Sequence, residues 1–298
     1  MNKGLLCFVI AYFMYIDGVD TVISISTAYG TTLGLGSVGM ILALLVTQIV
    51  AVPCSIWFSK LSEKISARRA ISGAVIIYTI ICIVGFYMGF SLEPHQAAYD
   101  EAIEEEFAGA VGIYSPEEFG DNATEGYITA YNSYIDQVKD TFLAKDRDEK
   151  LAALELTTDS TDEATKVLVE QMKEPLKETV NSFVSANIDV LDNYVNAIGF
   201  STFLFWCMAF LVGTVQGGIQ AVSRSYYGKL VPKERSNEFF GFFDIFGKFA
   251  AVIGPAMYAF ISNATGRSSY GVLCLIVLFM IGLIVLTVGR KEMDKLAK

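Results

Sequence analysis

The stretch at residues 213–255, GTVQGGIQAVSRSYYGKLVPKERSNEFFGFFDIFGKFAAVIGP, decides the fold. It begins inside an apolar run, leaves that run through a basic segment and enters a second apolar run. Two membrane-spanning helices joined by a basic loop are the simplest account of this pattern. The basic residues of the loop are Arg224, Lys229, Lys233 and Arg235.

The whole chain is too apolar for an ordinary soluble domain. Of its 298 residues 53% are hydrophobic and 13% aromatic, and the mean hydropathy is +0.46, so we expect an integral membrane protein. The net charge of −10 is unevenly divided, because residues 92–196 hold 24 of the 32 acidic residues and 7 of the 22 basic ones. The remaining positive charge lies in short loops beside apolar runs, a pattern that argues against nucleic-acid binding.

Six apolar runs are long enough to cross a bilayer, which predicts an all-α membrane protein with six transmembrane helices. We place these helices at residues 4–28, 34–58, 70–90, 197–221, 239–261 and 269–289. For the first run a secretory signal peptide is the alternative, because one lysine and about a dozen apolar residues precede Asp17. No small-residue cleavage site follows at the right distance, and the run continues to Ala28.

The charge of the loops predicts the orientation in the membrane. The loop SKLSEKISARR at residues 59–69 is basic, and the positive-inside rule places it and both termini in the cytoplasm. We therefore expect a multi-pass protein of the cell membrane in three regions: transmembrane helices 1–3 at 1–91, an acidic extracytoplasmic insert at 92–196, and transmembrane helices 4–6 with a cytoplasmic tail at 197–298. The charged residues of the loop are Lys60, Glu63, Lys64, Arg68 and Arg69.

The later part of the insert has helical periodicity. Apolar residues recur there at three- and four-residue steps, which predicts an amphipathic helix that leads into the fourth span. We expect Pro175 to start a new helix, because proline fits a first turn and not a helix interior. The recurring residues are Val169, Met172, Leu176, Val180, Phe183 or Val184, Leu191 and Val195.

Four polar residues recur in the first span at helical steps: Asp17, Asp20, Thr21 and Ser24. This spacing places them in one stripe, and each ionised carboxylate at mid-bilayer costs about 3 kcal/mol on insertion scales. A carboxylate in such surroundings can load and release a proton, and Asp17 is the deeper of the two. The alternative is that these groups lie near the outer surface or bond to neighbouring helices without a transport role.

Two further polar pairs are four residues apart and so share a helix face. Gln216 and Gln220 can bind a polar solute or join helices to one another. Asp244 and Lys248 can form a structural ion pair, or a charge switch whose partner changes during transport. Gly213, Gly217 and Gly218 allow close helix packing beside the glutamines, and we expect the dipeptide Gly254–Pro255 to interrupt the fifth helix.

No catalytic pattern competes with these features. The only histidine, His95, lies at the start of the insert, and no nucleophile elbow or phosphate loop is present. The five cysteines fall in apolar runs without metal-ligand spacing, which favours small buried side chains. We expect neither enzyme activity, a cofactor nor a metal.

Two stretches resemble a known transporter family: YFMYIDGVDTVISISTAYG at 12–30 and the run from Val215 to Pro255. They are similar to the C-terminal half of the major facilitator superfamily branch that includes the autophagy-linked vacuole effluxers and their bacterial relatives. The loop at 59–69 is similar to the basic loop between the second and third helices of each superfamily half. Ser62, Glu63 and Ser66 stand where versions with glycine and aspartate are more usual.

The resemblance implies a carrier of twelve helices in two halves, with the solute passing between the halves by alternating access. It implies a central cavity near Asp17, Asp20, Gln216 and Gln220. It also implies a cytoplasmic gate at the loop 59–69 and at Arg224, Arg235 and Glu238. Because the chain accounts for one half, we expect a second six-helix half, supplied by a separate chain, by a second copy or by the rest of a truncated reading frame.

The sequence therefore predicts secondary active transport of a small polar solute across a lipid bilayer, with an amino acid as one candidate and Asp17 as the proton site. The alternative is a non-transporting membrane protein whose helices display the acidic insert for binding. The remaining candidates for the transport cavity are Thr21, Ser24, Asp244 and Lys248.

Overall fold

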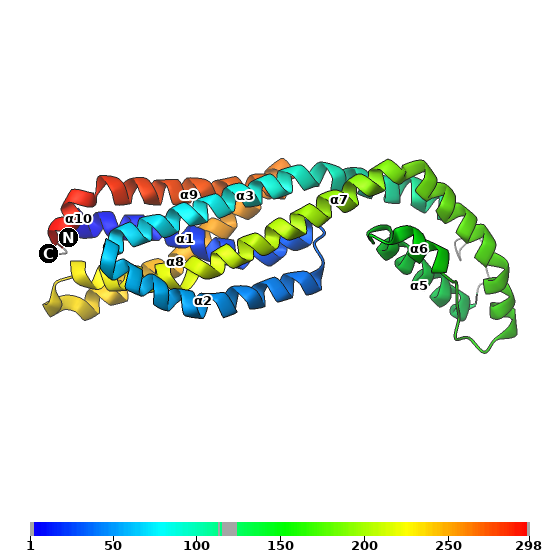
Figure 1. Cartoon of the computed structure of the whole chain (residues 1–298), viewed down its shortest axis with the longest axis horizontal. Coiled ribbons are helices and arrows are strands. Elements are labelled where there is room, and N and C mark those ends of the chain that lie inside the picture. The colour runs from blue at the N-terminus through cyan, green and yellow to red at the C-terminus, as the bar shows by residue number, and fades with distance from the viewer. Residues whose placement is uncertain (1–2, 113, 115–123, 297–298) are drawn as a thin grey trace. The chain divides into compact units, whose positions relative to one another are not determined.

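The computed structural model describes residues 3–112, 114 and 124–296, and every regular element in these ranges is helical (Figure 1). The bounds of the elements are α1 Lys3–Thr32, α2 Ser37–Ile65, α3 Ala67–Glu101, a π-helical turn Ala102–Phe107, α4 Ala108–Gly112, α5 Glu125–Phe142, α6 Arg147–Ala153, α7 Glu163–Leu230, a 3-10 turn Lys233–Arg235, α8 Ser236–Thr265, α9 Ser268–Val288 and α10 Arg290–Leu296.

The chain divides into two compact units. Met1–Glu93 and Phe200–Lys298 form one, which we call the membrane unit, and Pro94–Gly199 forms the other, which we call the insert. Within the described residues, six helices are long and apolar enough to cross a membrane: α1, α2, α3, α7, α8 and α9. This confirms the predicted all-α fold with six transmembrane helices, and the protein is a multi-pass membrane protein.

Helix α1 is the best covered of the six spans. In its most apolar window 56% of the residues are buried inside the protein, compared with 17% for α2 and for α8. Helices α8 and α9 both pack against it, and its aromatic side chains stack on those of α8 and α7. The ring of Tyr12 lies 4.0 Å from that of Phe243, and the buried hydroxyl of Tyr15 is 2.6 Å from Ser223 Oγ. Helix α1 is thus the centre of the membrane unit.

Glycines bring α7 and α2 together, as the sequence predicted. A Cβ added at Gly213 would lie 2.8 Å from the Thr47 carbonyl oxygen, and one added at Gly218 would lie 2.4 Å from the ring of Phe58. Such small residues let helix backbones approach closely in a bilayer, where lipid supplies no hydrophobic driving force between helices.

Two proline predictions were wrong. Pro175 lies inside α7, and Pro255 lies inside α8, which continues through Gly254. Around Pro175 the side chains of Met172 and Leu176 are buried in the core of the insert. This tertiary packing offsets the local cost of a proline in a helix interior.

The insert has its own hydrophobic core. Tyr127 and Phe142 of α5 and Phe107 pack there with one face of α7, which supplies six of the predicted positions. Asp162 precedes α7, and its Oδ2 accepts hydrogen bonds from the Thr165 amide (2.9 Å) and hydroxyl (2.7 Å). These bonds lower the pKa of Asp162. These six positions are Val169, Met172, Leu176, Val180, Phe183 with Val184, and Leu191, whereas the seventh, Val195, is partly buried and lies outside this core.

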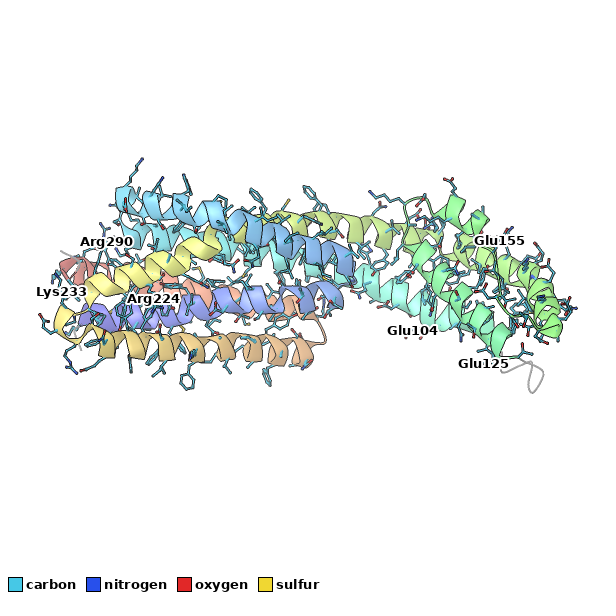
Figure 2. The ribbon with its side chains drawn as sticks, turned by 90° about the horizontal axis from the view of Figure 1, so that it is seen from below. Glu104, Glu125, Glu155, Arg224, Lys233 and Arg290 are labelled. Carbon is cyan, nitrogen blue, oxygen red and sulfur yellow. The ribbon has the colours of Figure 1, made fainter. Side chains whose placement is uncertain are left out.

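The basic residues collect at one end of the membrane unit. Figure 2 shows Arg224, Lys233 and Arg290 together at that end, and Glu104, Glu125 and Glu155 on the insert. Gly4 at the start of α1 lies against the Glu292 backbone of α10, so the first and last described helices meet there too. The helices of the membrane unit therefore have one strongly basic end.

Candidate functional site

Asp17 connects α1 to α8 in the interior of the membrane unit. Its side chain is 1% exposed, and its Oδ1 accepts a hydrogen bond of 2.9 Å from the Gly254 amide. Its Oδ2 and the hydroxyl of Thr21, one turn along α1, are buried without a hydrogen-bond partner among the described residues. Only glycine fits at position 254, since a Cβ there would collide with the Thr21 hydroxyl. The two helices thus meet at a buried carboxylate.

The four polar residues of the first span do not share one environment. Asp17 and Thr21 are buried, whereas Asp20 is partly buried and Ser24 is exposed. The Ser24 hydroxyl donates to the Thr21 carbonyl oxygen at 3.1 Å. Asp17 and Thr21 therefore form one row on α1 that faces the interior of the membrane unit. Asp20 and Ser24 form a neighbouring row on its more open side.

A cavity of about 100 Å³ lies within the membrane unit. Of the sequence-predicted candidates only Gln216 lines it, and its Oε1 is a buried acceptor without a partner in the described part of the chain. The lining contains no charged side chain. The polar residues around the cavity are Ser26, Tyr29, Thr47, Gln48 and Gln216.

The hydroxyls of the cavity wall already have partners. The Tyr29 hydroxyl donates to the Gly85 carbonyl oxygen (2.8 Å), and the Thr47 hydroxyl is bonded to the carbonyl oxygens of Ala43 and Ala209 (2.9 and 3.1 Å). The cavity therefore offers the side-chain amides of Gln48 and Gln216, including the buried acceptor of Gln216, on a mainly apolar wall. It can hold a small molecule with a hydrogen-bond donor but supplies no counter-charge.

Of the two interpretations of Asp244 and Lys248, the structural ion pair between them is absent from the described residues, and the charge switch stays a prediction. Asp244 Oδ1 instead accepts from Arg224 of α7 at 3.2 Å, and all three side chains are exposed. The i,i+4 spacing places Asp244 and Lys248 on one face, but the guanidinium from the neighbouring helix reaches the carboxylate. Gln220 on α7 is exposed as well and does not line the cavity.

The gate candidates divide into one buried residue and several exposed ones. The side chain of Arg68 is 10% exposed, and its Nε donates to Asp294 of α10 at 3.1 Å. Arg235 is bonded to Glu238 through Nε (3.0 Å) and Nη2 (2.6 Å). The exposed candidates of the loop are Lys60, Glu63, Lys64 and Arg69.

Sequence reasoning missed a group of hydrogen bonds that joins the end of α3 to the start of α9. Glu93 accepts hydrogen bonds from Arg267 Nε, from the Ser269 amide and from the Ser269 hydroxyl, each at 2.7 Å. The Arg267 guanidinium also lies over the ring of Phe90, 4.8 Å from its centroid. An acid at the end of one apolar run and an arginine before another were the available signal, but their sequence separation concealed the pairing.

The family comparison matches most of the chain. A family profile described as "Vacuole effluxer Atg22 like" matches residues 1–104 and 188–295. The matched residues contain all six membrane-spanning segments and leave out 105–187, which belong to the insert.

Curated relatives are named as transporters or autophagy proteins. The chain is 31% identical over 290 residues to the "Uncharacterized MFS-type transporter YxiO" of Bacillus subtilis, covering 97% of this chain and 42% of that protein. It is 30% identical over 115 residues to the Autophagy-related protein 22 of Saccharomyces cerevisiae, covering 37% of this chain and 22% of that protein. The chain thus spans less than half the length of these relatives. No solved structure matches it.

We expect Arg68→Ala to lower the melting temperature of the purified protein, because it removes the bond that holds α10 to the loop 59–69. Hydrogen bonds to charged groups contribute about 1.5–3 kcal/mol. Since Asp294 is 46% exposed, we expect the lower end of this range. Arg69→Ala is the matched control, with the same charge change at an exposed neighbour. Equal losses for the two variants would contradict a specific role for Arg68.

Proposed function

We propose that the chain, which belongs to the Atg22-like family of vacuole effluxers within the major facilitator superfamily, carries a small polar solute across the membrane by alternating access. The transporter class follows from the family and from the relative named as an MFS-type transporter. The solute, with an amino acid as one candidate, belongs to our proposal.

The observation that carries the proposal is the cavity that Gln216 lines inside the membrane unit. A buried amide oxygen without a partner is costly in an apolar helix bundle, and a bound donor would satisfy it. The cavity wall has no counter-charge for the ammonium or carboxylate group of an amino acid. We therefore propose that such a solute meets its charged partners outside this cavity, on a second half.

A second six-helix half is the partner that the exposed polar residues require. Gln48 on α2, Gln220 on α7 and Asp244 with Lys248 on α8 lie in spanning helices and are exposed. Polar and ionisable side chains within a membrane rarely face lipid. The Bacillus relative, of which the chain covers 42%, is long enough to contain such a half. We propose that this half covers these residues and completes the path of the solute.

We propose that the basic end of the membrane unit faces the cytoplasm of a cell-membrane protein. Arg224, Lys233 and Arg290 lie at that end (Figure 2), and cytoplasmic loops carry an excess of basic residues. The insert at 92–196 then lies outside. The pairs Arg68–Asp294 and Arg224–Asp244 would act at the cytoplasmic gate.

The partner proposal predicts that transport needs more than this chain. In proteoliposomes, we expect counterflow of labelled amino acids when the chain is assembled with a second six-helix half, and none when it is reconstituted alone. The control is the same assembly with unlabelled solute omitted from the lumen. An isolated chain that is monodisperse, monomeric and transport-competent would contradict the proposal.

The second candidate function is display of the acidic insert by a non-transporting membrane protein. The separate core of the insert favours it, because such a unit can fold around its own apolar side chains. Deleting 92–196 and joining α3 to α7 through a short flexible linker separates the two functions. Our proposal predicts that counterflow partly survives the deletion. An assembly that shows no counterflow even with the insert present, although its membrane unit is folded, would favour display.

A further inference from the structure

We propose that Asp17 is a proton-binding site that works as a latch: ionised Asp17 holds α8 at Gly254, and protonated Asp17 releases it. The inference deepens the proposed transport function and rests on it, since it assigns the coupling site of the same membrane unit. It starts from the contact between the Asp17 carboxylate and the Gly254 amide at 2.9 Å.

The site is built to hold one small positive charge. The Asp17 side chain is 1% exposed and Thr21 is fully buried. One carboxylate oxygen has the Gly254 amide as its partner, while the other and the Thr21 hydroxyl have none among the described residues. Protonation of the free oxygen removes the charge of this buried carboxylate without a basic residue.

The titratable groups that interact with Asp17 lie on two helices. Asp20 of α1 and Cys274 of α9 are the titratable groups that interact with it electrostatically. The group that α8 presents is the uncharged Gly254 amide. In the described part of the chain no lysine or arginine forms an ion pair with Asp17. Proton occupancy, rather than exchange of a basic partner, is therefore the available means of neutralising the carboxylate.

Protonation changes the strength of the bond to α8. A hydrogen bond to an ionised carboxylate is roughly twice as strong as one between neutral groups. Losing the negative charge therefore weakens the hold of α1 on the Gly254 amide.

Helix α8 is suited to respond at this point. Pro255 lies inside the helix and has no N–H, so one rung of the backbone ladder is missing beside the Asp17 contact. Helices bend most readily at such positions. The outer face of α8 is also open, since Phe249 is 66% exposed and Val252 63%. Within the membrane unit, α8 is therefore held from one side.

Hydrogen exchange of the full chain in lipid nanodiscs tests the latch without any solute. The probe is pH, and the readout is protection of peptides that contain Gly254, corrected for the intrinsic pH dependence of exchange. We expect protection to fall about tenfold as the pH is lowered through the titration of Asp17. In Asp17→Asn the corrected protection should be independent of pH.

A matched variant keeps the test sharp. Asp20→Asn removes the neighbouring carboxylate and should keep a pH-dependent loss of protection. If Asp17→Asn does not fold, the natural protein and Asp20→Asn still test the latch, since both must lose protection as the pH falls. A natural protein without pH-dependent protection, or an Asp17→Asn variant that responds as it does, would overturn the latch.

The result separates the latch from the transport proposal. Exchange without a pH response overturns the latch and leaves transport intact. A normal pH response in an assembly that moves no solute would instead overturn transport and leave a proton-binding contact between α1 and α8.

Discussion

The hydrogen bond from the Gly254 amide to Asp17 joins the features on which the membrane unit depends. A carboxylate inside an apolar bundle is costly, so α1 must bring it against a donor. The donor is a backbone amide that is reachable because residue 254 has no side chain. Burial of α1 by α8 and α9 follows from the same close approach. The polar and apolar parts of the packing thus require one another at this contact.

The rest of the membrane unit has a similar division of roles. Charged pairs hold its ends, with Arg68–Asp294 and Glu93–Arg267 as the most buried examples. The middle contains the cavity with the Gln216 acceptor. The unsatisfied polar groups of the middle are the ones that a bound solute or ion could pair with.

The fold could be predicted from the sequence because span length and apolar composition are strong constraints in a bilayer. The site was predictable only in part. Helical spacing placed Asp17 and Thr21 on one face but could not say that Gly254 would meet them. The same limit explains Asp244, which forms its ion pair with Arg224 of another helix and not with its i,i+4 neighbour Lys248. Pro175 misled for the opposite reason, since packing in the core of the insert overrode a local preference, while Pro255 lies inside a helix that simply continues through it.

Coupling of the carrier through Asp17 can be measured as solute accumulation driven by a pH gradient, compared with solute exchange at equal pH, for the assembled carrier and its Asp17→Asn variant. The Asp17→Asn variant should retain exchange but lose the accumulation that the gradient drives. An Asp17→Asn carrier that accumulates solute with its full dependence on the gradient would contradict this coupling.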